Sequence, residues 1–170
     1  LLAKNIKASE PHAGKIDYDI DGRLVGNWFV ENTNGYEGTE SNRNAGRYWA
    51  THLSFAYDGL DPSLIMISLG DYNDESKQFA VKGNSPDPAT VGVSTGIVKY
   101  ELVDYEYTTE GGNWDRVSYA RGLKAIGMNE VQGVILAQLI EDRRLKFEAF
   151  PGKTAPEVTG FTNAAKIYER

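Results

Sequence analysis

The sequence lacks cysteine, so disulfide bonds and thiolate metal sites are excluded. With 170 residues, the chain can bury enough surface to fold as one domain, residues 1–170, without such cross-links. The lack of cysteine fits the cytoplasm, and it also fits an exported protein that has no disulfides. Because the first residue is leucine, we expect a processed or trimmed chain without its targeting peptide, for which secretion or a periplasmic location is one outcome. The sequence does not decide between these compartments.

Basic residues and long apolar runs are also scarce. The 18 Lys and Arg residues face 24 Asp and Glu residues, which gives a net charge of −6 and no basic run. Such a charge is unsuited to gripping phosphate backbones, so nucleic acid is not an expected partner. No apolar stretch approaches the roughly 20 residues of a membrane-spanning helix, and we expect a soluble protein. The expected partner is a small molecule; no pattern indicates a cofactor or an oligomeric state.

Glycine, tyrosine and β-branched residues are frequent, and they occur in patterns with the period of a β-strand. The clearest pattern lies in residues 14–29. Ile16 to Asp21 alternates apolar side chains with aspartates, Asp21-Gly22 suits a tight turn, and Leu24 to Phe29 forms a second apolar run. These features predict a β-hairpin.

Further strands are predicted along the chain. Residues 49–57 alternate, with Trp49 on the same face as the apolar residues that follow, and residues 64–69 are apolar on both faces. Between residues 97 and 107 the alternation changes phase, as it does at a β-bulge or a sheet corner. Residues 131–150 then read as a hairpin that turns at 141–144.

The C-terminal segment, residues 152–170, has a different pattern. Thr154 and Glu157 have the spacing of a capping box. Phe161, Ala165 and Tyr168 then recur at helical spacing. This segment therefore predicts a short C-terminal helix.

Together the patterns predict an all-β fold in which residues 1–13 form an N-terminal extension. We expect a single antiparallel barrel of about eight to ten strands, because closure removes exposed sheet edges and requires a curved sheet. A β-sandwich is the alternative. A barrel of about eight strands has an interior that can hold one small ligand.

Aromatic residues are the main candidates for ligand binding. Tyrosine and tryptophan near loops can stack on a sugar or on a flat apolar molecule, although most aromatics in sheets are core residues. The polar loop 31–47 is either a surface excursion or a lid over a binding site. Gln138 lies in an otherwise apolar strand and needs a polar partner. The candidate ligand-binding residues are Trp28, Tyr36, Tyr48, Trp49, His52, Tyr100, Trp114 and Gln138.

One histidine is a candidate for catalysis. If its side of the strand faced the barrel interior, His52 could act as an acid–base group with Asp58 or with an interior tyrosine. That arrangement would suit an isomerase, cyclase or lyase, whereas the ordinary interpretation is a structural or surface histidine. Residues 92–96 match the letters of a serine-hydrolase elbow, but both histidines, His12 and His52, precede them, and a glycine-rich turn is favoured.

A carboxylate cluster near the first turn is a weak candidate for a metal site. Asp17, Asp19 and Asp21, followed by Gly22, match the first half of a calcium loop. The position of the bidentate glutamate in such a loop is taken by Trp28, so a solvated strand face is the favoured interpretation and no metal is expected. The remaining possibility is a calcium-assisted, carbohydrate-binding β-sandwich.

The motif Gly26-Asn27-Trp28-Phe29, in an early strand of an all-β chain of this size, resembles the GxW signature of lipocalins and of the wider calycin group. The resemblance implies that Trp28 closes one end of an eight-stranded barrel and that a late arginine, Arg170 or Arg144, packs across it. It also implies a small, largely apolar ligand inside the barrel. Our leading hypothesis is therefore a small-molecule-binding barrel without catalysis of its own.

Overall fold

The structure is a computed structural model that describes residues 19–170. The predicted extension 1–13, His12 and Asp17 lie outside the described residues. The described residues form nine strands: β1 Gly26–Val30, β2 His52–Tyr57, β3 Ile65–Tyr72, β4 Glu75–Val81, β5 Val98–Thr109, β6 Gly112–Asn113, β7 Lys124–Glu141, β8 Arg144–Pro151 and β9 Lys166–Glu169. The single α-helix of the described residues is α2, Glu40–Asn44, and the other helical elements are short 3₁₀ turns. No helix in this part of the chain has the length and apolar character needed to cross a bilayer.

Eight of the strands form a closed antiparallel barrel. Their order is β4-β3-β2-β1-β9-β8-β7-β5, and β4 pairs with β5 through Ala80–Val103 and Val81–Leu102 to close the circle. The prediction of an all-β barrel is therefore confirmed, and the β-sandwich alternative is wrong because the β4–β5 pairing joins the two ends of the sheet. This architecture is consistent with a calycin-like barrel.

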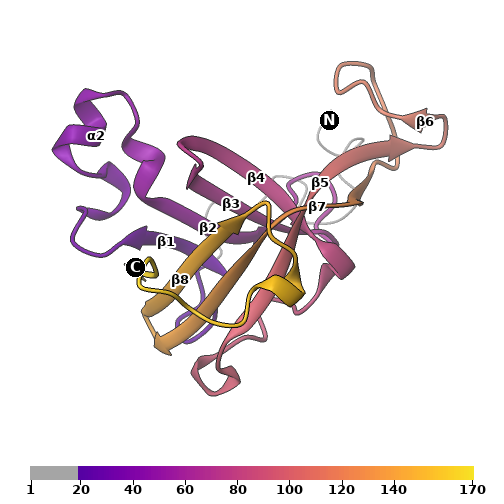
Figure 1. The fold of residues 1–170 in the computed structure, drawn as a ribbon. Coiled ribbons are helices and arrows are strands. Elements are labelled where there is room, and N and C mark those ends of the chain that lie inside the picture. Colours follow the sequence, from indigo (N-terminus) through magenta and orange to yellow (C-terminus); the bar gives the residue numbers. More distant parts are fainter. Residues whose placement is uncertain (1–18) are drawn as a thin grey trace.

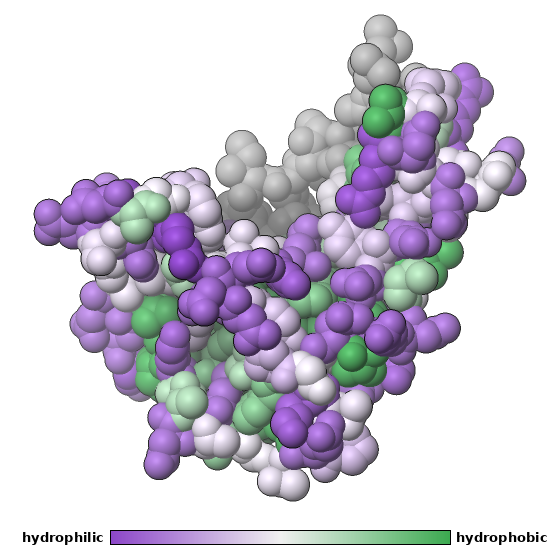
Figure 2. Space-filling view, turned by 45° about the horizontal axis from the view of Figure 1, so that its top comes forward, coloured by the Kyte–Doolittle hydropathy of each residue, from purple (hydrophilic) through white to green (hydrophobic). Residues whose placement is uncertain are grey.

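The two longest strands extend beyond the barrel as an arm. β5 and β7 continue together past the point where β4 pairs, and β6 adds to the end of β5 (Figure 1). The predicted change of phase is confirmed, because the β5–β7 register shifts at Leu102/Val103 and again between Val103 and Tyr105. Such irregularities bend a strand, and here they lie where β5 leaves the barrel wall. The arm includes the exposed side chains of Val117 and Ile126. The space-filling view shows a mostly hydrophilic surface on the arm (Figure 2).

Side chains fill the barrel interior. Inward-facing residues of all eight barrel strands form one cluster, and its buried members are 0–8% exposed. A side chain that bordered a void able to hold water would expose area to that void, and large members such as Trp28, Phe55 and Ile67 are 0% exposed. These interior side chains therefore pack against one another, and the expected hollow for a guest is not found among them.

Two predicted elements differ from the structure. The hairpin of residues 14–29 is wrong in its described part: Asp19 and Ile20 belong to no strand, and β1 pairs with β2 and β9 instead. The C-terminal helix is limited to a 3₁₀ turn at 155–157, which has the predicted capping box. Tyr168 lies in strand β9, because its side chain packs inside the barrel while the backbone pairs with β1 and β8.

An arginine closes one end of the barrel, as the calycin resemblance implies. The guanidinium carbon of Arg170 lies 4.1 Å from the centre of the Trp28 ring, and the arginine side chain is 3% exposed. Arg170 donates hydrogen bonds to the carbonyls of Val25, at 2.8 Å, and Arg23, also at 2.8 Å. Arg144 instead pairs with Glu31 on the surface. Of the two candidates, Arg170 therefore has the position that the resemblance implies for the late arginine.

Gly26 can be no other residue in this packing. Its φ angle is +124°, and a Cβ there would lie 2.2 Å from Oδ1 of Asp19 and 2.5 Å from Nη1 of Arg170. We expect Gly26→Ala to lower the free energy of unfolding by about 2–4 kcal/mol, through backbone strain and overpacking. Urea denaturation measures this, with Gly160→Ala as the control because a Cβ at Gly160 meets nothing within 4 Å. Equal losses in the two variants would contradict the steric argument.

Arg170→Lys tests the closure itself. Lysine can neither stack a planar group on Trp28 nor donate to several carbonyls at once, so buried carbonyl oxygens lose their partners. We expect a loss of about 2–4 kcal/mol in the free energy of unfolding, measured by urea denaturation. The control is Arg121→Lys. Arg121 is exposed and lies over the Tyr119 ring, so this variant should leave the denaturation midpoint unchanged. An unaltered midpoint for Arg170→Lys would show that the stack contributes little.

Candidate functional site

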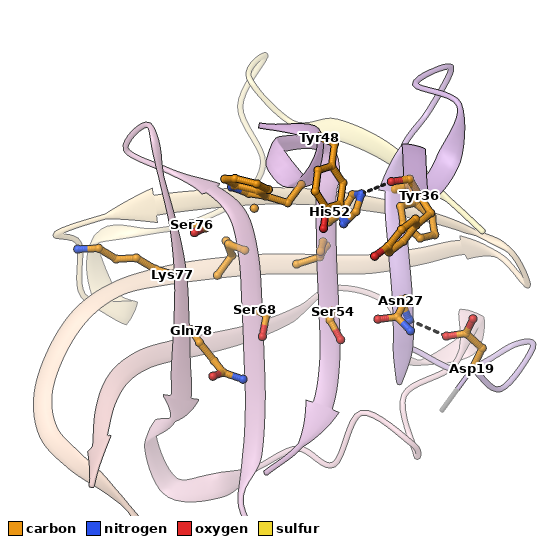
Figure 3. Close-up of a pocket in the computed structure, with 15 residues that line it drawn as sticks. Asp19, Asn27, Tyr36, Tyr48, His52, Ser54, Ser68, Ser76, Lys77 and Gln78 are labelled. Carbon is orange, nitrogen blue, oxygen red and sulfur yellow. Dashed lines mark hydrogen bonds between the residues drawn. The ribbon is translucent and has the colours of Figure 1, made fainter. Parts of the chain in front are cut away.

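A cleft of about 930 Å³ lies on the outer wall of the barrel. Its floor is the outward face of β1 to β4, and its upper wall comes from the segment 31–51, which joins β1 to β2 (Figure 3). This segment contains the 3₁₀ turn 35–37, helix α2 and the 3₁₀ turn 48–51. The predicted strand 49–57 is therefore wrong at its start, because β2 begins only at His52.

The segment 31–51 is held against the barrel wall by close backbone contact. A Cβ at Gly70 of β3 would lie 1.7 Å from the carbonyl oxygen of Trp49, so only glycine permits this approach. Within the segment, the Thr39 side chain caps α2 by accepting a hydrogen bond from the Asn42 amide at 3.1 Å. These contacts fix the position of the segment over the cleft.

An aromatic cluster forms the upper part of the cleft. The ring of Tyr36 lies 5.8 Å from that of Tyr48 and 5.2 Å from the imidazole of His52, and Tyr48 lies 5.2 Å from Trp49. Phe29 of β1 meets His52 edge-on at 5.0 Å. Tyr36, Tyr48 and Trp49 remain 67%, 38% and 37% exposed. The structure thus brings together four of the predicted binding residues and leaves three large rings available to a ligand.

His52 ties the strand to the segment 31–51. Its Nε2 lies 2.9 Å from the carbonyl oxygen of Tyr36, which can only accept, so Nε2 carries the proton. Burial lowers the pKa of His52 and outweighs the opposite effect of this hydrogen bond. Hydrogen bonding with Tyr36 raises the pKa of Tyr48. At neutral pH the cleft therefore presents a neutral imidazole at His52 and a neutral phenol at Tyr48.

Polar residues form the floor below the rings. Asn27, Ser54, Ser68 and Gln78 come from β1, β2, β3 and β4 in turn and face the same side of the sheet (Figure 3). These four residues were not predicted as a site. Their common side follows from the register between neighbouring strands, and period-2 alternation alone could have shown only that they face outward.

The other predicted binding residues lie elsewhere. Trp28 and Tyr100 are 0% and 1% exposed in the barrel core, where the Trp28 indole donates to the Leu24 carbonyl at 2.9 Å. Trp114 belongs to the arm, where its Nε1 donates to the carbonyl of Ser118 at 2.7 Å. Gln138 is half-buried on the outward side of β7. Alternation assigned these side chains to strands but not to the same surface.

The structure does not bring the predicted pair His52 and Asp58 together. His52 begins β2 and Asp58 directly follows its end, which separates them by about 20 Å at a rise of about 3.3 Å per residue. The Asp58 carboxylate accepts hydrogen bonds from the amide of Asp61, at 2.7 Å, and from the hydroxyl of Tyr107, at 2.5 Å. Burial, followed by the hydrogen bond to Asp58, raises the pKa of Tyr107. The Asp58 carboxylate therefore belongs to the turn that follows β2. The interior Tyr100 donates to the carbonyl of Pro86 at 2.9 Å and does not approach His52.

The acidic candidates are held by arginines. Asp19 Oδ1 lies 3.8 Å from Nη1 of Arg170 and accepts a 2.6 Å hydrogen bond from the backbone N–H of Asn27, and Asp21 pairs with Arg143 at 3.8 Å. Residues 19–170 contain no group of three or more metal-ligating acids or histidines. Residues 93–95 form a 3₁₀ turn that leads into β5, as the interpretation of a glycine-rich turn predicted.

Comparisons with protein-family models, with curated protein sequences and with solved structures gave no match. What can be said of function therefore follows from the geometry of the cleft and of the barrel.

The pKa of His52 can be measured directly. We expect NMR titration of its ring protons to give a midpoint below the ordinary value of 6.5, because burial favours the neutral ring. A lowered folded-state pKa contributes stability that is complete above the unfolded value and is lost as the pH falls through the folded value. His52→Gln keeps a donor for the Tyr36 carbonyl but cannot titrate, so the pH dependence of unfolding below about pH 6.5 should be smaller in the variant. A midpoint at or above 6.5 would contradict this assignment.

Proposed function

We propose that the protein binds a small molecule in the cleft between the outer face of β1 to β4 and the segment 31–51, without catalysis of its own. The observation that carries this proposal is the pairing of three exposed rings, Tyr36, Tyr48 and Trp49, with a polar floor. Small-molecule sites combine apolar and aromatic walls with a few polar groups that orient the ligand. The cleft has this composition and a volume within the usual range for such sites.

Preorganisation supports the proposal. The hydrogen bond between His52 and the Tyr36 carbonyl and the contact between Trp49 and Gly70 hold the rings in place before any ligand arrives. A site that is already ordered loses little conformational entropy on binding, so more of the contact energy appears as affinity. The segment 31–51 thus serves as a fixed wall of the site.

Charge pairing favours binding over acid–base chemistry. The Asp19 carboxylate is paired with Arg170, and the Lys77 ammonium lies 3.6 Å from Glu75. His52 has its donor nitrogen engaged by a backbone carbonyl. A general acid or base must be able to exchange its proton with a reacting atom. In the cleft, the titratable groups of Asp19, Lys77 and His52 already have partners, which disfavours this role.

The barrel, the GNW motif and the stack of Arg170 on Trp28 support a relationship to the calycin group as part of this proposal. The site proposed here differs from the interior ligand site that the resemblance implies. Interior side chains occupy that space, and the aromatic residues that are free to contact a ligand lie on the outer wall.

Two neutral probes, indole and phenyl β-glucoside, test the proposal. We expect each to shift the indole N–H signal of Trp49 in ¹H–¹⁵N NMR spectra and to leave those of Trp28 and Trp114 in place. Trp49→Ala should weaken binding of phenyl β-glucoside by about tenfold, because a stacking ring is lost. Trp114→Ala, in the arm, should bind as the unaltered protein does. Shifts at Trp28 alone, unchanged affinity in Trp49→Ala, or binding of neither probe would overturn the proposal.

A further inference from the structure

The polar floor of the cleft is a straight row that crosses four strands. The register places Asn27 opposite Ser54, Ser54 opposite Ser68, and Ser68 opposite Gln78. Figure 3 shows these side chains next to one another, with the rings of Tyr48, His52 and Tyr36 in a second row beside them. Three strand spacings of about 4.8 Å give the polar row a length of about 14 Å.

Most hydrogen-bonding groups of the row are not used by the protein. Within residues 19–170, the amide of Asn27 and the hydroxyls of Ser54 and Ser68 make no side-chain hydrogen bond, although all three residues are half-buried. Gln78 accepts a hydrogen bond from the Tyr105 hydroxyl at 3.0 Å through its carbonyl oxygen and keeps its NH₂ group. Buried polar groups normally have a hydrogen-bond partner, in the protein or in ordered water. The row thus presents both donors and acceptors to a molecule that lies in the cleft.

The described residues that line the cleft carry no unpaired charge where the row lies. Its carboxylate and its ammonium group, those of Asp19 and Lys77, stand at opposite ends and each has a partner of opposite charge. The lowered pKa of His52 keeps the imidazole uncharged at neutral pH. A ligand with a net charge would be desolvated here without a free counter-charge, which is costly.

We infer that the ligand of the cleft is a neutral, extended saccharide of two or three rings, an inference that rests on the proposed function. A sugar carries hydroxyls along its whole length, which matches a row of unpaired amides and hydroxyls about 14 Å long. Its C–H faces stack on aromatic rings, which matches Tyr48 and Trp49 beside the row. A flat heteroaromatic ligand has polar atoms only at its rim and would leave most of the row without partners.

Isothermal titration calorimetry with defined neutral trisaccharides tests the ligand class. The probes are cellotriose, maltotriose, xylotriose and N,N′,N″-triacetylchitotriose, with glucose as the short comparison and trigalacturonic acid as the charged one. We expect at least one neutral trisaccharide to bind, and to bind more tightly than glucose and trigalacturonic acid. Tighter binding of trigalacturonic acid would overturn the neutral class, and equal binding of glucose would overturn the extended one.

The double variant Ser54→Ala/Ser68→Ala tests the row itself. It should weaken binding of that trisaccharide by roughly 10- to 30-fold, because two hydrogen bonds are lost. The same variant should unfold at the same temperature as the unaltered protein, since neither hydroxyl bonds to another residue of the described chain. Ser94→Ala, an exposed serine of the 3₁₀ turn before β5, is the matched control and should leave trisaccharide binding unchanged.

The outcomes separate the two proposals. If indole and phenyl β-glucoside bind in a manner that depends on Trp49 but no trisaccharide binds, the saccharide inference is overturned and the proposed function stands. If a trisaccharide binds equally well to the double serine variant, the row is not its site and the inference is also overturned. If no probe of either kind binds, both proposals fail.

Discussion

Eight strands in a closed barrel enclose a space only wide enough for side chains or for one small ligand, and in this protein side chains occupy it. Large residues such as Trp28, Phe55 and Tyr100 fill the interior from several strands. Dense packing of this kind stabilises the fold because each side chain keeps its contacts on all sides. The same packing leaves the outer wall as the place where the barrel can meet a ligand.

The outer wall is suited to this role only where β1 to β4 lie under the segment 31–51. Other parts of the outer wall carry apolar side chains that the chain itself covers: Met66 and Ala80 pack against residues of β5 and β7, and Val134 and Leu136 pack against Val158 of the C-terminal segment. Beneath the segment 31–51 the outward positions other than Phe29 are small or polar, and Gly70 lets the backbone of the segment come close. Here the fold places aromatic rings over a polar patch. Such an arrangement lowers the stability of the fold unless water or a ligand forms hydrogen bonds with the polar groups.

Much of the fold could be predicted because local patterns carry it. Alternation indicated the strands, the change of phase near Val103 indicated the irregular β5–β7 pairing, and the GNW motif indicated both the closing tryptophan and Arg170 as one of two candidate partners. Strand β9 was missed because it has only four residues, and apolar residues spaced three and four apart imitate a helix. Its strand conformation is imposed by partners far away in the sequence, β1 and β8, which local spacing does not contain.

The candidate site was predicted in its aromatic half and missed in its polar half, for a physical reason. Tyr36, Tyr48, Trp49 and His52 are near one another in sequence, so a loop and the strand that follows it bring them together without knowledge of the pairing. The polar row depends on three registers between separate strands, and a shift of one residue in any of them would turn a side chain to the interior. Those registers are fixed by the interior packing around residues such as Phe55. The core therefore acts on the proposed site at a distance, because it determines which polar side chains of the outer wall lie in one row.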